Sequence, residues 1–126
     1  MTKKEERELL FNKYGGKCAY CGEELPEKGW HADHIEAIRR NKRKWESGMQ
    51  KPHLDIIENK NPSCASCNIN KHKMTIEQFR KQIEGFVNSM NERMTQYKLA
   101  KRYGLVTETG IKVEFWFEKY EKNSEE

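Results

Sequence analysis

The stretches Cys18-Ala-Tyr-Cys21 and Cys64-Ala-Ser-Cys67 decide how this chain must fold. Each is a Cys-x-x-Cys turn that presents two sulfur atoms on the same side, and two such turns complete a tetrahedral four-thiolate site. Zinc suits thiolate ligands and takes closed coordination in structural sites. The 126 residues contain 4 cysteines, all used in this pattern, which therefore predicts one structural zinc ion. The competing interpretations are redox-active cysteines and two chance pairs of cysteines.

The composition is consistent with a metal-stabilised protein. The chain is 35% hydrophobic and 35% charged, so its apolar core must be modest, and small cores usually need a disulfide, a metal or a similar constraint. Close cysteine pairs in a reducing compartment indicate metal rather than disulfides. No run approaches the roughly 18 apolar residues of a membrane span. We therefore expect one cytoplasmic domain over residues 1–126 with no membrane partner.

Working outward from the cysteine turns, the sequence predicts several short elements. A capping box at Thr2 predicts a helix that runs towards Tyr14. Residues 30–35 have the composition of a short strand, and residues 53–58 offer a second extended segment. A further helix is expected at residues 68–73, directly after the second cysteine turn.

The C-terminal part predicts one long helix followed by a β-hairpin. Thr75 and Gln78 form another capping box, and Gly104 is a natural helix stop. Between them apolar residues recur at helical spacing, namely Ile76, Phe79, Ile83, Phe86, Val87, Met90, Met94 and Tyr97. Residues 105–117 are typical of a hairpin because positions 111, 113, 115 and 117 are all apolar. Residues 74–126 would thus extend a core at about residues 17–73.

Two groups of polar side chains lie within or beside the loop that a zinc ion would close. Asp33 offers a hard oxygen ligand for Mg²⁺ or a similar cation, and the adjacent His34 can accept a proton from water near neutral pH. Asn68 directly follows Cys67 and shares a helix face with His72, four residues later. A strand-borne Asp33 facing a helix-borne Asn68 would form a small cation site.

The order of these motifs resembles that of the HNH endonuclease family, most closely its small phage and bacterial members with four zinc-binding cysteines. The resemblance covers residues 17–73, nearly half of the chain. The matching positions are Cys18 and Cys21, then Asp33-His34-Ile35, then Glu58-Asn59, and finally Pro62, Cys64, Cys67, Asn68 and Lys71.

The resemblance implies an α+β fold built on a ββα-metal core, with two short antiparallel strands and a metal-binding helix. His34 would be the general base, and Asp33 and Asn68 would ligate a catalytic Mg²⁺ or Mn²⁺ ion. Asn59 would orient His34 and hold the intervening loop through backbone hydrogen bonds. Lys71 would hold a phosphate. The implied reaction is phosphodiester hydrolysis with one cation, giving 5′-phosphate and 3′-hydroxyl ends.

The sequence departs from the family pattern at two places. Asn68 stands where the family has its last histidine, a common variation that leaves His72 as an additional candidate ligand. The usual glycine-rich segment between the strands is missing, and residues 36–50 are unusually basic. This segment is either a loop or an exposed helix.

Basic residues crowd positions 39–44, where Arg39, Arg40 and Arg43 are the predicted nucleic-acid contacts. The net charge is +4 and the tail after Tyr120 is mostly acidic, so this local cluster suits a polyanion. We expect DNA as the partner, with RNA not excluded, and phosphate contacts carry no sequence information. A solvated charged loop is the competing interpretation. The long helix is also a candidate homodimer surface, and a dimer would convert nicking into double-strand cutting.

A function of a different class competes with the nuclease. A non-catalytic zinc-knuckle module that binds nucleic acid would keep the cysteines and the basic cluster. It would not need Asp33, His34 and Asn68 together, so their joint presence favours the enzyme. A third interpretation is a nuclease that depends on a partner protein for cutting.

Overall fold

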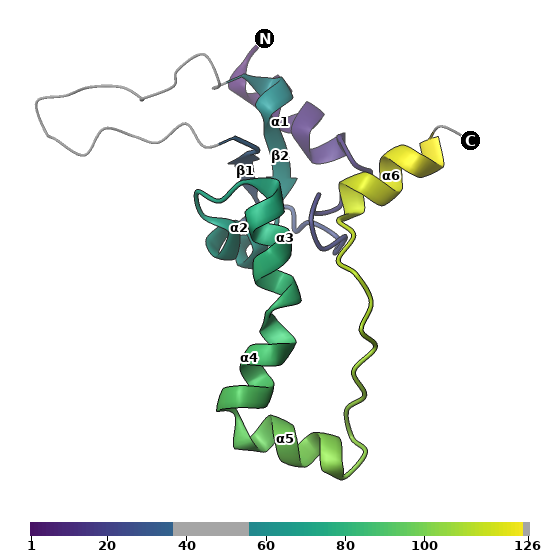
Figure 1. Cartoon of the computed structure of the whole chain (residues 1–126). Coiled ribbons are helices and arrows are strands. Elements are labelled where there is room, and N and C mark those ends of the chain that lie inside the picture. Colours follow the sequence, from purple (N-terminus) through teal and green to yellow (C-terminus); the bar gives the residue numbers. More distant parts are fainter. Residues whose placement is uncertain (37–55, 125–126) are drawn as a thin grey trace, which may run out of the picture.

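The structure is a computed structural model that describes residues 1–36 and 56–124. Helices and one small two-stranded antiparallel sheet make up an α+β fold (Figure 1), as the sequence predicts. In chain order the elements are α1 (Lys3–Asn12), β1 (His31–His34), η2 (Ile57–Asn59), β2 (Lys60–Ser63), α2 (Ala65–Lys71), α3 (Ile76–Glu84), α4 (Phe86–Arg93), α5 (Thr95–Arg102) and α6 (Trp116–Ser124).

The sheet consists of β1 and β2, which places His31 opposite Ser63 and His34 opposite Lys60. The predicted strand at residues 30–35 is confirmed, and its partner is β2 rather than the second extended segment predicted at residues 53–58. Residues 53–55 lie outside the described residues, and the chain from Ile57 forms the 3-10 turn η2. The true partner contains Pro62, which lacks an N–H and is tolerated because both strands are edge strands.

The predicted helix starts at Thr2 and near Asn68 are both present. The Thr2 hydroxyl accepts a hydrogen bond from the Glu5 backbone N–H at 3.1 Å, so α1 begins at its cap. Helix α2 begins three residues earlier than predicted because Cys64 acts as its N-cap and accepts from the Cys67 N–H. The second cysteine turn and the helix start are therefore one structure.

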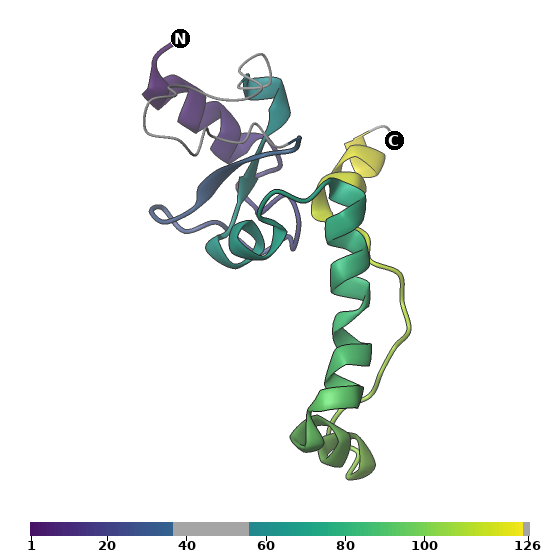
Figure 2. The ribbon, with the colours of Figure 1, turned by 60° about the vertical axis from the view of Figure 1, so that its left-hand side comes forward.

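The predicted single long helix is wrong. The capping box of Thr75 and Gln78 does start α3, but the helical segment divides into α3, α4 and α5. Gly85 separates α3 from α4 while keeping a helical backbone, and Met94 takes an extended conformation with φ −116° and ψ 100°. Helices α4 and α5 extend away from the core (Figure 2), so no packing against the core favours one continuous helix there.

The predicted hairpin over residues 105–117 is also wrong. Residues 105–115 carry no assigned helix or strand, and Trp116 and Phe117 begin α6. The Glu118 carboxylate accepts a hydrogen bond from the Phe115 N–H at 2.9 Å, which favours a helix start over a strand. The alternating apolar residues over positions 111–117 do not mark a strand face, because only the C-terminal end of this stretch packs in the core.

An aromatic cluster joins the first cysteine turn to two distant segments. The ring of Tyr20 meets Phe79 of α3 and Phe115 edge-on, each at 5.5 Å between centroids. Phe115 stacks on Phe79 at 5.5 Å and on Phe117 at 5.9 Å. The backbone N–H groups of Trp116 and Phe117 donate to the carbonyls of Tyr20 and Ala19. The C-terminal helix is thereby anchored on the cysteine turn.

Across residues 1–36 and 56–124 the structure contains no helix that is both long and apolar enough to cross a membrane.

Candidate functional site

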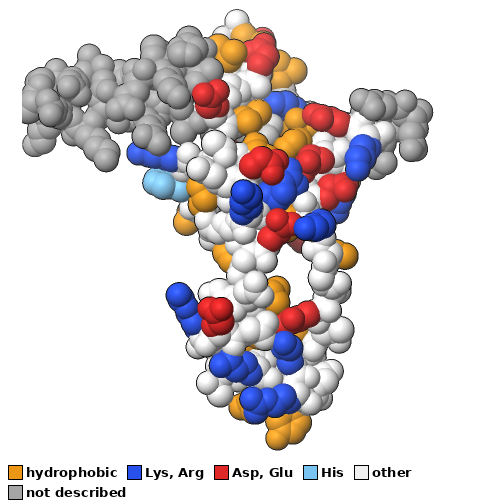
Figure 3. Space-filling view, viewed as in Figure 1, with side chains coloured by type: hydrophobic (Ala, Val, Ile, Leu, Met, Phe, Trp, Pro, Cys, Tyr) orange, Lys and Arg blue, Asp and Glu red, His pale blue; other side chains and the backbone are white. Residues whose placement is uncertain are grey.

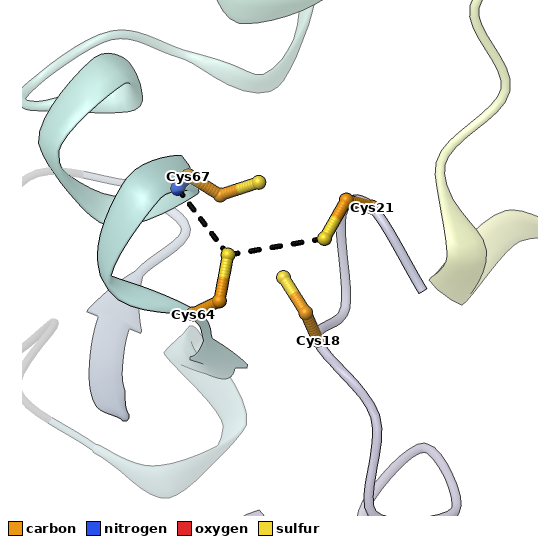
Figure 4. A group of neighbouring side chains, drawn as sticks. All are labelled: Cys18, Cys21, Cys64 and Cys67. Carbon is orange, nitrogen blue, oxygen red and sulfur yellow. Dashed lines mark hydrogen bonds between the residues drawn. The ribbon is translucent and has the colours of Figure 1, made fainter. Parts of the chain in front are cut away.

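The four cysteines converge on one point. Their sulfur atoms all lie within 4.8 Å of one another, and among the described residues this is the one group of three or more His, Cys, Asp or Glu side chains close enough to share a metal ion. Figure 4 shows Cys18 and Cys21 approaching from the first turn, and Cys64 and Cys67 from the start of α2. The predicted grouping of these cysteines is confirmed.

Local hydrogen bonds prepare the sulfur atoms for this arrangement. The Tyr20 N–H donates to Cys18 Sγ and the Cys67 N–H donates to Cys64 Sγ, each at 3.4 Å. A hydrogen bond from the Cys67 thiol, reinforced by backbone hydrogen bonds, lowers the pKa of Cys18 below its ordinary value. Gly22 closes the first turn with φ +78°, a conformation that favours glycine. The donor set fits a tetrahedral thiolate-binding metal.

A buried polar network connects the first cysteine turn to β1 and α2. Asp33 is 5% exposed, and its Oδ2 atom accepts a hydrogen bond from the Tyr20 hydroxyl and lies 3.0 Å from Lys71 Nζ. Lys71 also donates to the His34 carbonyl at 3.0 Å. Burial, followed by the charge of Asp33, raises the pKa of Tyr20 well above its ordinary value. Tyr20 therefore remains a neutral donor to the carboxylate.

Lys71 is buried within this network. Its side chain is 0% exposed and its ammonium is held by Asp33 and the His34 carbonyl, so Lys71 balances the charge of a buried carboxylate. The phosphate contact that the family resemblance implies for Lys71 stays a prediction.

The other oxygen of Asp33, Oδ1, has no hydrogen bond or ion pair with the described residues. All hydrogen bonds and ion pairs of Asp33 within the described residues end on Oδ2. No buried side-chain oxygen or nitrogen in that part of the chain lacks a partner, so Oδ1 must carry the exposure that Asp33 retains. An oxygen in this position can ligate a cation while Oδ2 stays in the network.

Asn59 holds the end of β1 with three hydrogen bonds. Its carbonyl accepts from the Ile35 N–H at 2.7 Å. Its side chain pairs with the Glu36 backbone in both directions, accepting from the N–H at 3.0 Å and donating to the carbonyl at 2.9 Å. As predicted, Asn59 makes hydrogen bonds to the backbone at the end of β1. That Asn59 also orients His34 stays a prediction.

Two of the remaining predicted site residues lie on β1 and α2, and these elements lie against each other (Figure 1). His34 is half-buried on β1, and Asn68 is half-buried one residue after Cys67. The side-chain amide of Asn68 makes no hydrogen bond to any other described residue. His72 is exposed beyond the end of α2 at φ 49°, and it does not join Asp33 and His34 in a three-ligand group. Arg39, Arg40 and Arg43 lie outside the described residues.

Sequence reasoning missed two members of the polar network. Neither Tyr20 nor Asn61 was among the predicted site residues. Asn61 is 1% exposed, accepts from Lys13 Nζ at 3.2 Å and forms a side-chain hydrogen bond with Tyr20. No periodic pattern marks either residue, because each gains its role only when β1 and β2 pair.

Comparison with known proteins gives no relative for this chain: no family model, no curated protein and no solved structure matches it.

Proposed function

We propose that this chain is a metal-dependent DNA endonuclease of the HNH type, with a structural zinc ion in the cysteine cluster. His34 would act as general base, and Asp33 Oδ1 and the Asn68 amide oxygen would bind a catalytic Mg²⁺ or Mn²⁺ ion. The observation that carries this proposal is that β1 and α2 are held together and that α2 is held by the cysteine cluster. The strand that bears Asp33 and His34 is tied to the helix that bears Asn68 by Lys71, and that helix starts within the cysteine cluster.

The two metal sites would have different tasks. Four thiolates leave zinc no coordination position for water, so the zinc ion would fix the relative positions of the first turn and α2. A carboxylate oxygen and an amide oxygen leave most positions of a Mg²⁺ ion open, as a site for water and phosphate requires. Such an ion would stabilise the charge that develops on the scissile phosphate and on its leaving oxygen.

The residues of the chain would divide the remaining work. His34 would take the proton from the attacking water. The pinned backbone at Glu36 would fix the end of the strand on which His34 lies. Tyr20 and Lys71 would hold Asp33 Oδ2, so that Oδ1 keeps one orientation. This rigidity is what a catalytic constellation needs from its supporting residues.

A plasmid-nicking assay with added Mg²⁺ or Mn²⁺ tests the proposal. We expect His34→Ala to reduce cleavage by roughly 10²–10⁴-fold while the protein retains its zinc content and its melting temperature. His31→Ala is the matched control, because His31 lies on the same strand and is exposed, and it should cleave like the native chain. Cleavage by His34→Ala at the native rate would contradict the assignment.

One observation favours a non-catalytic nucleic-acid-binding module as the second candidate. The burial of Asp33 against Lys71 and Tyr20 accounts for this carboxylate without any catalytic cation. The module predicts stoichiometric zinc and retained DNA binding, but no cleavage with either cation. The same assay, run with a binding measurement in parallel, therefore separates the two functions.

A further inference from the structure

Helices α4 and α5 and the segment that follows them form an arm that stands away from the core (Figure 2). We call residues 86–112 the distal arm. None of these residues is buried. The arm begins directly after α3, with only Gly85 between the two helices. Because the arm has no buried core, its accessible side chains are the feature to consider for a function.

The arm is nevertheless an ordered unit. Glu108 lies on the segment that returns from α5, and its carboxylate accepts from Tyr97 and Asn91 at 2.8 Å each and contacts Lys101 at 2.9 Å. The Leu105 N–H donates to the Ala100 carbonyl at 2.9 Å. These bonds hold the returning segment against α4 and α5, so the side chains of the arm keep a defined arrangement.

The arm carries a surplus of positive charge. Its basic residues are Arg93, Lys98, Lys101, Arg102 and Lys112, whereas its carboxylates are Glu92 and Glu108. Glu108 pairs with Lys101. The side chains of the other four basic residues have no hydrogen bond or ion pair with any residue in 1–36 or 56–124. Figure 3 shows Lys and Arg side chains gathered over the end of the arm.

The placement of these cations suits a linear polyanion. Lys98 and Arg102 are four residues apart on α5 and so share one face of that helix. Tyr103, which follows Arg102 directly in the chain, is 78% exposed and offers an accessible aromatic ring at the end of α5. A basic helix face with an adjacent aromatic side chain is a common footprint of nucleic-acid binding.

The reach of the arm fits a duplex that also contacts the core. Helices α3 and α4 run from Ile76 to Arg93, which at 1.5 Å per residue is about 27 Å. One turn of B-DNA is about 34 Å. The combined length of α3 and α4 is therefore comparable to one helical turn of a duplex.

We infer that the distal arm binds the phosphate backbone of duplex DNA through Arg93, Lys98, Arg102 and Lys112. The inference rests on the proposed function, because it assigns the same substrate to a second surface. A second copy of the chain would suit the exposed Leu105 and Ile111, but pairing two arms would bring like charges together. Charge complementarity therefore favours DNA as the occupant.

The test is fluorescence anisotropy with a labelled duplex of about two turns, with no divalent cation added so that no cleavage occurs. The variant replaces Arg93, Lys98, Arg102 and Lys112 by Gln. The control replaces Lys3, Lys4, Lys28 and Lys119 by Gln, four exposed cations outside the arm. Each phosphate contact contributes about 0.9 to the slope of log K against log salt. We expect the arm variant to lose at least tenfold in affinity and roughly 2–4 in slope, and the control to lose much less.

Equal affinity and slope for the arm variant and the native chain would overturn the inference. So would sedimentation velocity showing that the native chain is a dimer and the arm variant a monomer, because the arm would then be a dimer interface. Binding and cleavage are measured separately. A chain that binds DNA through the arm but never nicks a plasmid would therefore refute the nuclease and leave this inference standing.

Discussion

The core and the distal arm both contain apolar residues at helical spacing but differ in what holds them together. In the core, the cysteine cluster, the Tyr20–Asp33–Lys71 network and the aromatic cluster bury side chains from distant segments. In the arm, apolar residues at the same helical spacing stay accessible, such as Phe86 at 41% and Met94 at 45% exposure. This difference shows that apolar residues at helical spacing mark a helix face that can be buried. Whether that face is buried depends on whether another part of the protein packs against it.

Metal removal should produce the largest difference in stability between the core and the distal arm. Structural zinc sites contribute apparent free energies of roughly 10–16 kcal/mol in small domains, so a strong thiol-competing chelator should unfold the core. We expect hydrogen exchange to show loss of protection around β1, β2 and α2, with little change in the arm. Added zinc should restore the protection. Equal loss of protection in both regions would show that arm and core unfold as one unit.

Substitution of Lys71 tests the buried charge pair of the core. Lys71→Met removes the cation and leaves the carboxylate of Asp33 buried without it, which typically costs about 3–5 kcal/mol. Urea unfolding of the metal-loaded protein measures the loss. Lys73→Met is the matched control because Lys73 is exposed, and it should leave the midpoint unchanged. A small effect of Lys71→Met would mean that Asp33 is solvated rather than paired.

Two tyrosines that donate to a carboxylate allow the same substitution in both regions. Tyr20 donates to Asp33 inside the core, and Tyr97 donates to Glu108 on the surface of the arm. Tyr20→Phe should destabilise the protein by about 1–3 kcal/mol because a buried acceptor loses its donor. Tyr97→Phe should leave the unfolding midpoint unchanged, because water replaces the lost donor. Equal effects would remove the distinction that we draw between the two regions.

The smallest effect is expected from protonating Glu108. Hydrogen bonds from Lys101 first, and then from Asn91 and Tyr97, lower the pKa of Glu108 from 4.5 to about 2. A lowered pKa means that the contacts stabilise the arm above pH 4.5 and are lost as the pH falls towards 2. Glu108→Gln should mimic the acid form at neutral pH. We expect faster amide exchange at Leu105 with an unchanged melting temperature, and a lowered melting temperature would contradict this.

The sequence allowed the short-range features to be predicted and failed where the outcome depended on tertiary surfaces. The cysteine cluster, β1 and the caps at Thr2 and Thr75 follow from spacings of a few residues, and the structure has all of them. The hairpin failed because Phe115 is apolar for the aromatic cluster rather than for a strand face. The burial of Lys71 was not predicted, since no local pattern shows that a lysine will pair with a carboxylate on a distant strand.

The clamp formed by Asn59 has a consequence for how this protein can change over time. It fastens Glu36 to the turn that precedes β2, so both ends of residues 37–55 depart from one fixed base. The entropy of closing a loop grows only slowly with its length. Insertions or exchanges between these ends should therefore leave the neighbouring strands in place.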